Sequence, residues 1–287
     1  MLMTRFIHAI TLSLLFSGCF QQIAMNSLGG IMDLGFEVIN EEQDLDIAEK
    51  SIATNLKLLE TILRSDPDNQ HYLQLACQGY ASYALGFAED DSADRAKFLY
   101  LRARDFGMRS LNRNSKFAAA VTQGGDELRN ALNTFSRNDL PVIFWTATAW
   151  GSYASLSLTD PAALADLPKV EIMMRYIVEK DAPYFYGGAH FFLGTLYGSR
   201  PTLLGGNPDS SRAHFEACLN IGKREFLMPF VYYARSYAVQ TQNQELFDQY
   251  LTFVDTTSID VLPSARLSNA IAKRKAKLLR DRTSELF

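Results

Sequence analysis

Hydrophobic residues recur at spacings of three and four along most of the chain, with polar residues between them. Ile52, Leu56, Leu59 and Leu63 form one such stripe, which ends at the turn-forming residues 65–69. This spacing places apolar side chains on one face of an α-helix, whereas a half-buried strand would alternate apolar and polar residues. No segment alternates for long enough to favour a strand, so the sequence predicts an all-α fold.

Turn signals divide this pattern into a series of amphipathic helices. Ser92 is a typical N-cap residue, and Gly124 and Gly125 lie in a loosely patterned connection between two predicted helices. Beyond the first stripe, helices are predicted over approximately 70–88, 92–111, 126–135, 140–157, 160–180, 183–198, 208–221, 228–240, 244–256 and 264–282.

Consecutive predicted helices share a pattern of small and aromatic residues. Two pairs show it most clearly: Ala76, Cys77, Tyr80, Ala96, Tyr100 and Ala103 in one, and Leu193, Gly194, Tyr197, Ser211, Phe215 and Cys218 in the other. Small residues allow two helices to approach closely, which is typical of tetratricopeptide-like repeats. The chain is therefore predicted to form an α-solenoid of about four cryptic repeats, with residues 19–287 as a single domain.

The first eighteen residues have the features of an export signal. Arg5 precedes a short apolar run, and Ser17, Gly18 and Cys19 follow that run. The end of the segment resembles a bacterial lipobox, so we expect acylation of Cys19 and attachment to a membrane through the lipid. Plain secretion is the alternative. Phe20 does not match an inner-membrane retention signal, which favours the outer membrane as the site of the anchor.

Composition excludes some classes of function. A formal net charge of −4 gives no support for nucleic-acid binding, which uses clustered basic side chains. No metal-ligand spacing is present, and no cofactor is predicted. Cys77 and Cys218 could form a disulfide in an oxidising compartment, but buried free thiols are favoured because both lie within helical patterns. The basic residues over 273–282 are interpreted as the solvated face of a terminal helix, and contact with an acidic partner or anionic lipid head groups is the alternative.

The turn before residue 209 is the strongest local signal for a ligand site. Gly205, Gly206, Asn207 and Pro208 precede a predicted helix, whose N-terminus could bind an anion. However, no lysine followed by serine or threonine comes after the glycines, and no strand precedes them. We therefore predict a structural turn, with Asn207 as the N-cap and Pro208 in the first helical position.

No catalytic set emerges from the sequence. His71, His190 and His214 are far apart along the chain, and no serine lies in a Gly-x-Ser-x-Gly turn. His190 is interpreted as a packed or hydrogen-bonded histidine. The chain is therefore not predicted to be an enzyme. A cleft that gathered His190, His214 or Glu216 around a perturbed pKa would reopen the question.

The aromatic residues carry more information about function. Nineteen Phe, thirteen Tyr and two Trp exceed what helix stacking needs, and they cluster over 144–150 and 184–192. Two interpretations stay open, namely a purely structural core or a partly exposed apolar lining for a ligand or partner segment. The candidates for such a groove are Trp145, Trp150, Tyr184, Phe185, Tyr186, His190 and Phe191.

One region resembles a known family. The residues that carry the resemblance are Gly187, Gly188, Ala189 and His190, then Leu193 and Gly194, then Pro201, and then the segments 204–208 and 212–217. They look like the signature region of the T components of TRAP (tripartite ATP-independent periplasmic) transporters, which are lipoproteins built from tetratricopeptide-like helix pairs. The signature turn then comprises Pro201, Gly205, Gly206, Asn207 and Pro208.

This resemblance implies a function that composition and spacing do not supply. It implies a periplasmic protein that docks a solute-binding protein and assists uptake of an organic, hydrophobic solute. It also implies a homotrimer with a central apolar passage. The alternative from another class is a structural lipoprotein that scaffolds an envelope assembly complex.

Overall fold

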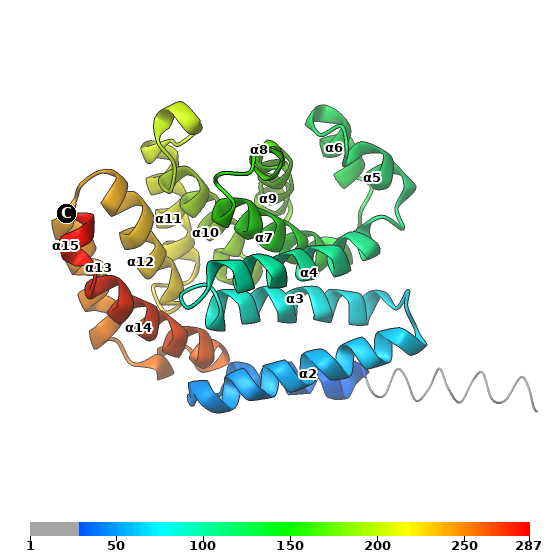
Figure 1. The fold of residues 1–287 in the computed structure, drawn as a ribbon, viewed down its shortest axis with the longest axis horizontal. Helices are drawn as coiled ribbons and strands as arrows, with labels where there is room; N and C mark the ends of the chain where they lie inside the picture. Colours follow the sequence, from blue (N-terminus) through cyan, green and yellow to red (C-terminus); the bar gives the residue numbers. More distant parts are fainter. Residues whose placement is uncertain (1–28) are drawn as a thin grey trace, which may run out of the picture.

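The computed structural model describes residues 29–287, so the predicted signal peptide and Cys19 lie outside the described residues. The described residues form helices joined by turns and loops and contain no strand in that range, which confirms the all-α prediction (Figure 1). Residues 29–40 are helical. The further helices are α2 Leu45–Ser65, α3 Gln70–Phe87, α4 Ala93–Leu111, α5 Ser115–Ala120, α6 Gly125–Leu132, α7 Leu140–Leu156, α8 Pro161–Ala165, α9 Leu167–Asp181, α10 Tyr184–Gly198, α11 Pro208–Ile221, α12 Met228–Tyr233, α13 Gln244–Thr256, α14 Arg266–Arg280 and α15 Thr283–Leu286.

Polar side chains cap several helices at the predicted places. The Ser92 hydroxyl accepts a hydrogen bond from the Arg95 backbone N–H at the start of α4. The Asn243 side chain accepts one from the Leu246 N–H at the start of α13, whose bounds match the prediction. These caps satisfy backbone donors that have no partner within the helix, which explains why local sequence marked the boundaries well.

Two predictions about helix boundaries are wrong. The single helix expected over 160–180 is two helices, α8 and α9, separated at Asp166. Pro168 explains the break, because proline has no N–H to donate to the carbonyl four residues earlier and its ring clashes with that carbonyl, whereas proline fits the first turn of a new helix. The loose connection before Gly124 contains the short helix α5, which the Asn114 side chain caps.

Two helices also depart from regular geometry. In α10, Phe185, Tyr186 and Gly187 have positive φ values of 47°, 57° and 78°. The helix predicted over 228–240 begins as α12 and continues as a π-helix over Ala234–Ala238. Both irregular segments contribute residues to the lining of the cavity that is described below.

Close approach of neighbouring helices confirms the predicted role of small residues. A Cβ atom added to Gly194 on α10 would lie 2.9 Å from the Phe215 ring on α11. A Cβ atom added to Gly107 on α4 would lie 1.9 Å from the Thr146 hydroxyl on α7. Each glycine therefore holds two helices closer than any side chain would permit. The helix pairs α3–α4 and α10–α11 pack together as a helical-repeat fold requires.

The helix pairs follow a curved path that brings the last long helix back to the first ones (Figure 1). Helix α14 packs against α2, and Arg266 Nη1 donates to the Glu41 carbonyl at 2.8 Å. Lys275 Nζ on α14 lies 2.7 Å from Asp90 Oδ2, and this side chain is only 3% exposed. Lys275 is therefore an exception to the predicted solvated face. These contacts close the superhelix around an interior.

Both described cysteines are buried and free, as favoured from the sequence. Cys77 Sγ lies 3.8 Å from the Thr146 hydroxyl, and Cys218 Sγ lies 3.5 Å from the Tyr186 carbonyl. Burial raises the pKa of each thiol to about 12. Both thiols therefore stay protonated at neutral pH and act as small hydrophobic side chains.

Candidate functional site

A cavity of about 840 Å³ lies inside the curve of the helices. Its size falls in the range of about 300–1,000 Å³ that is typical of small-molecule sites. Helices α3, α7, α10, α12 and α14 all contribute to its wall, together with the helix over 29–40. Its apolar lining includes Phe36, Ile39, Ile52, Leu85, Phe87, Phe144, Trp145, Leu156, Leu167, Phe185, Phe191, Phe192, Leu196, Phe226, Met228, Val239, Leu267 and Ile271.

Of the seven predicted groove residues, three line the cavity and four lie outside its lining. Trp145, Phe185 and Phe191 line the cavity. Phe185 packs on Trp145 with ring centroids 4.8 Å apart, and Phe191 packs on Tyr232 with ring centroids 5.1 Å apart. The sequence therefore located one aromatic part of the cavity wall.

The other four candidates lie outside the lining. Trp150 Nε1 donates to Asp166 Oδ2 at 3.1 Å, which directs its ring toward the junction of α8 and α9. The Tyr186 hydroxyl lies 2.9 Å from the Ser264 hydroxyl. Tyr184 packs behind the wall on Phe144, and burial raises its pKa to about 12. The fourth, His190, is described below.

Left-handed backbone at the start of α10 brings Phe185 into the wall. A positive φ is rare for an aromatic residue and costs about 1–3 kcal/mol, so surrounding contacts must stabilise it. The Phe185 ring packs on Phe144, Trp145 and Phe226. Gly188 completes the arrangement, because a Cβ atom there would lie 2.6 Å from the Phe144 ring. The glycine-rich segment after Phe185 therefore allows the aromatic rings to pack closely.

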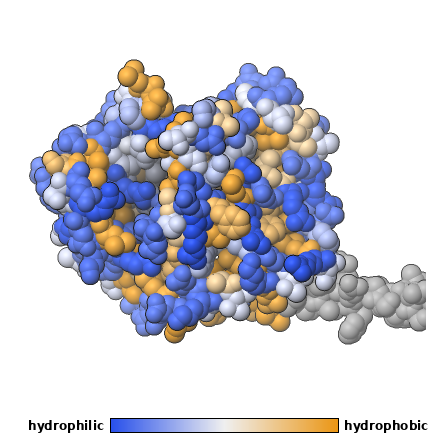
Figure 2. Space-filling view, in the orientation of Figure 1, coloured by the Kyte–Doolittle hydropathy of each residue, from blue (hydrophilic) through white to orange (hydrophobic). Residues whose placement is uncertain are grey.

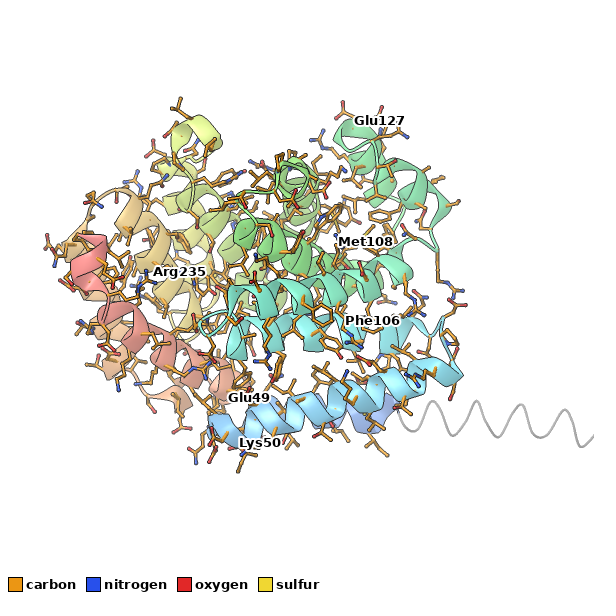
Figure 3. The ribbon with its side chains drawn as sticks, viewed as in Figure 1. Glu49, Lys50, Phe106, Met108, Glu127 and Arg235 are labelled. Carbon is orange, nitrogen blue, oxygen red and sulfur yellow. The ribbon has the colours of Figure 1, made fainter. Side chains whose placement is uncertain are left out.

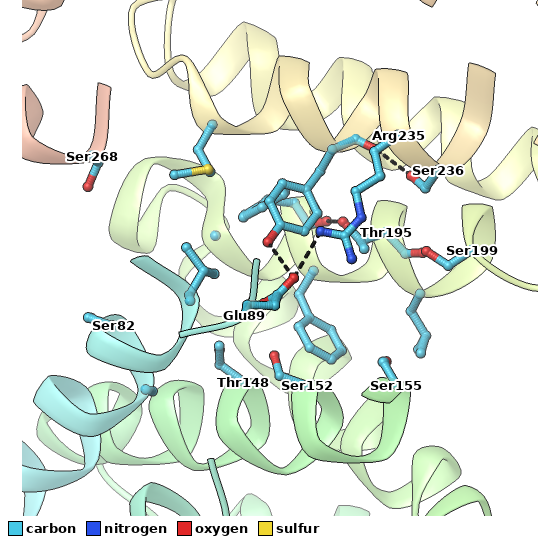
Figure 4. A pocket seen from close by; sticks show the side chains of 18 of the residues that line it. Ser82, Glu89, Thr148, Ser152, Ser155, Thr195, Ser199, Arg235, Ser236 and Ser268 are labelled. Atoms are coloured by element: carbon cyan, nitrogen blue, oxygen red, sulfur yellow. Dashed lines mark hydrogen bonds and ion pairs between the residues drawn. The ribbon is translucent and has the colours of Figure 1, made fainter. Parts of the chain in front are cut away.

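A buried carboxylate gives the cavity one polar region (Figure 4). Glu89 Oε1 accepts hydrogen bonds from the Tyr232 hydroxyl at 3.1 Å and from Arg235 Nη1 at 2.9 Å. Glu89 Oε2 accepts one from the Tyr100 hydroxyl at 2.8 Å. Burial raises the pKa of Glu89, but Lys275, Arg235 and these donors outweigh it and hold the pKa below its ordinary value. Glu89 is therefore ionised.

Arg235 extends from the π-helix toward Glu89 and the interior (Figures 3 and 4). Its side chain is 42% exposed, and because it lines the cavity this exposure includes the cavity itself. Its guanidinium also lies 5.1 Å from the centroid of the Tyr232 ring. Burial lowers the pKa of Arg235, but Tyr232 and Glu89 raise it above its ordinary value, so Arg235 carries a positive charge.

Hydroxyl side chains are distributed around the cavity wall. Figure 4 labels Ser82, Thr148, Ser152, Ser155, Thr195, Ser199, Ser236 and Ser268 around the cavity. Among the described residues, Thr148 Oγ1 and Gln240 Oε1 are buried in the wall without a hydrogen-bond partner. Both atoms are covered by surrounding protein atoms, and they are exceptions to the rule that buried polar atoms have hydrogen-bond partners.

The turn between α10 and α11 lies beside the cavity. Asn207 caps α11 by accepting a hydrogen bond from the Ser210 N–H at 2.9 Å, and Pro208 occupies the first turn, as predicted. Gly205 has a φ of 84°, and a Cβ atom on Gly206 would lie 1.7 Å from the Arg200 carbonyl oxygen. Both glycines are therefore required by the turn.

This turn carries two exposed leucines. Leu203 is 98% exposed and Leu204 is 67% exposed, and Figure 2 shows a hydrophobic tip where the loop before α11 protrudes. The exposed residues Ser199, Pro201 and Thr202 line the cavity, so it opens to the surface next to this tip.

The structure brings two distant histidines together outside the cavity lining. His190 Nδ1 lies 2.8 Å from His214 Nδ1, so one ring donates a hydrogen bond to the other. Burial lowers the pKa of His190, and burial, His190 and Arg175 lower the pKa of His214 to about 4. Glu216 instead accepts a hydrogen bond from the Tyr250 hydroxyl. The pair is neutral at pH 7 and packs against Tyr197.

Sequence reasoning missed Glu89, Arg200 and Arg235, which are the charged residues of the cavity wall. Glu89 follows the end of α3 and carried no local signal. Arg235 did carry one, because it is a single charged residue in the otherwise apolar run over 226–234 and 236–239. A charge within such a run is expected to have a buried partner or a function.

Within residues 29–287, no helix is both long and apolar enough to span a bilayer. In the same range, no three His, Cys, Asp or Glu side chains gather in a way that could hold a metal ion.

Comparison with known proteins assigns the family. The comparison with curated proteins finds no match. A family model described as the TRAP transporter T-component matches residues 41–287, which includes all the helices from α2 to α15. Because the match covers most of the chain, this protein belongs to the TRAP transporter T-component family.

Proposed function

We propose that this protein is the accessory lipoprotein of a TRAP transporter, and that its cavity holds an organic, largely apolar solute during uptake. The observation that carries this proposal is the aromatic-lined cavity of about 840 Å³ inside the curve of the helix pairs. Family membership supports a role in transport and a location in the cell envelope. A component of this kind is not expected to be an enzyme.

The proposal includes docking of a periplasmic solute-binding protein at the mouth of the cavity. Leu203 and Leu204 support this position, because exposed apolar side chains on a protruding turn suit insertion into a partner. Their turn adjoins the cavity opening at Pro201 and Thr202. A partner bound there would face the route into the cavity, so solute could pass between the two proteins without crossing bulk water.

The remaining parts of the proposal concern assembly and anchoring. Acylation of Cys19 would hold the protein at the periplasmic face of the outer membrane, and the resemblance in sequence supports a homotrimer. The cavity favours solute handling over the alternative of a structural scaffold, because a scaffold does not need a large apolar cavity.

Affinity purification from detergent-solubilised native membranes tests the proposed function. We expect a protein of the solute-binding class to co-purify with the wild-type chain. Replacing both leucines, Leu203→Ser with Leu204→Ser, is expected to lower its recovery at least about tenfold, because apolar anchors dominate such contacts. The double variant Leu58→Ser with Leu278→Ser, which changes exposed leucines away from the cavity, is the control. Absence of any solute-binding protein from the wild-type sample would contradict docking.

A further inference from the structure

The helix over 29–40 carries apolar side chains on two of its faces. On one face, Phe36 and Ile39 line the cavity. On another face, Ile31, Leu34 and Val38 follow one another at spacings of three and four, and they are 63%, 61% and 69% exposed. A helix on the surface of a soluble protein normally presents polar residues where it does not contact the core. The face that carries Ile31, Leu34 and Val38 therefore has the composition of a contact surface.

Helix α2 extends this apolar surface. The two helices lie side by side, and Leu34 and Val38 share an open groove with Ser51 and Thr54 of α2 (Figure 1). Ile47, which is 53% exposed, lies one helical turn before Ser51 on the same side of α2.

We call Ile31, Leu34, Val38 and Ile47 the N-terminal patch. Twelve large apolar side chains are exposed over residues 29–287, and four of them lie in this short stretch of the chain. Single exposed apolar residues are normal on a protein surface, whereas a group of them marks a site of contact with a protein or a membrane.

The position of the N-terminal patch in the chain favours a membrane. The described helix begins at residue 29, ten residues after Cys19, which is expected to be acylated. A chain of ten residues spans at most about 36 Å, whatever its conformation. Acyl groups on Cys19 that insert into a bilayer would therefore keep the N-terminal patch close to the lipid surface.

The arrangement of the helices agrees with this position. Figure 1 shows α2 at one edge of the molecule, and the loop before α11, which carries Leu203 and Leu204, protrudes at the opposite edge. Contact between the N-terminal patch and a bilayer would point that loop away from the membrane. The proposed docking surface would then face the periplasm, where a solute-binding protein could reach it.

The charges around the N-terminal patch indicate which kind of lipid surface it suits. The segment 29–40 contains Asp33 and Glu37 but no lysine or arginine, and Asp46 follows in the first turn of α2. Attraction to anionic lipids uses clusters of basic residues, and Lys50 is the basic residue of the groove. Binding through this patch must therefore come from burial of apolar side chains rather than from charge.

We propose that the N-terminal patch binds the surface of a lipid bilayer with neutral head groups, into which Ile31, Leu34 and Val38 insert. This inference goes beyond the proposed function and adds a second membrane contact to its acyl anchor. An acyl anchor limits the distance of the protein from the bilayer, whereas a second contact also fixes its orientation. The patch and the anchor together hold the cavity opening beside Leu203 on the periplasmic side.

Vesicle flotation tests this inference on protein that begins at residue 19 and carries Cys19→Ser, so that neither a signal peptide nor an acyl group contributes. The vesicles consist of phosphatidylcholine with phosphatidylethanolamine, prepared with and without phosphatidylglycerol. We expect the parent protein to float with neutral vesicles, and added phosphatidylglycerol to give no increase. The triple variant Ile31→Ser, Leu34→Ser and Val38→Ser is expected to have a partition coefficient at least about tenfold lower.

The matched control changes three exposed apolar residues elsewhere. Phe98→Ser, Val261→Ser and Leu278→Ser remove side chains that are 61%, 38% and 44% exposed, and this variant is expected to partition as the parent does. Circular dichroism and native mass spectrometry of each variant verify its fold and its assembly.

Insertion of the side chains is measured by tryptophan fluorescence. In Leu34→Trp, we expect a blue shift of the added emission on mixing with neutral vesicles, and quenching by lipids brominated on their acyl chains. Phe98→Trp on α4 is expected to show neither change. Spectra of the parent protein with the same vesicles correct for Trp145 and Trp150.

Four outcomes would overturn this inference. They are absence of flotation of the parent with neutral vesicles, equal partition of the two triple variants, an emission from Leu34→Trp that vesicles do not alter, and a requirement for phosphatidylglycerol. The last would assign the contact to the basic residues over 273–282 instead. Loss of an assembly in the Ile31, Leu34 and Val38 variant would also overturn it, because the N-terminal patch would then contact a second copy of the chain.

These outcomes are independent of the proposed function. Failure of the N-terminal patch to bind vesicles would leave the solute cavity and docking of a solute-binding protein in place. Conversely, absence of a solute-binding protein from the affinity purification would leave the membrane contact in place.

Discussion

Single glycines set the distance between helices in this fold, and Gly107 is the sharpest case. Because a Cβ atom there would lie 1.9 Å from Thr146 Oγ1 and 3.0 Å from Cys77 Sγ, Gly107→Ala must push α4 away from α7. We expect a decrease of about 1–3 kcal/mol in the free energy of unfolding, measured by urea denaturation.

The matched control is Gly35→Ala, also in a helix but with no atom within 4 Å of the added Cβ. It is expected to leave stability unchanged or raise it by up to about 1 kcal/mol, because alanine favours a helix more than glycine does. Equal effects of the two substitutions would contradict the close-approach argument.

The histidine pair predicts how stability depends on pH. An unfolded histidine titrates near pH 6.5, whereas the pKa of His214 is about 4 and that of His190 is also lowered. Between these values the unfolded state binds more protons, so the free energy of unfolding falls as the pH falls from about 6.5 to about 4.

Urea denaturation at a series of pH values measures this slope. His214→Gln is expected to reduce it in that window, whereas His71→Gln leaves the pair intact and serves as the control. An unaltered slope in His214→Gln would show that other groups cause the loss of stability.

Thiol reactivity tests the burial of the two cysteines. In Cys19→Ser protein at pH 8, we expect Cys77 and Cys218 to resist a thiol-specific reagent, because burial raises both pKa values to about 12. Both are expected to react once denaturant is added without reductant. If denatured protein reacted only after reduction, the two cysteines would form a disulfide instead.

At the scale of elements, α14 closes the superhelix through a buried ion pair. Lys275→Met leaves Asp90 without its partner and also removes a charge that stabilises Glu89. Breaking such a pair costs about 3 kcal/mol or more, and we expect a loss of this size in urea denaturation. Arg280→Met on the same helix removes an exposed pair with Asp255 and is expected to cost less than about 1 kcal/mol. Similar losses for both would argue against closure through Lys275.

Most elements could be predicted from local sequence because local chemistry determines their ends. Caps such as Ser92, Asn207 and Asn243 satisfy the first backbone donors of their helices, and apolar stripes such as Ile52 to Leu63 are buried as expected. The break at Pro168 was missed because the apolar spacing continues across it. The π-helix over Ala234–Ala238 was missed because its sequence has the same spacing as an α-helix.

At the scale of the whole molecule, the sequence revealed only the aromatic half of the candidate site. Trp145, Phe185 and Phe191 belong to aromatic clusters that are visible in the sequence. The polar half unites Glu89 with Arg235, which are 146 positions apart, and depends on the closing of the helix path. No local pattern encodes such a pairing, because the curvature of the helix path determines it.

If the cavity binds a largely apolar solute, a cavity-filling substitution must weaken that binding, and calorimetric titration of 1-decanol measures the difference. Thr148→Phe places a large side chain in the wall of the cavity. Thr61→Phe adds the same group to the exposed face of α2 and is the control. In the Cys19→Ser background, we predict one bound 1-decanol per chain for the parent and for Thr61→Phe, and at least about tenfold weaker binding for Thr148→Phe. Absence of binding to the parent, or unchanged affinity in folded Thr148→Phe, would contradict the claim.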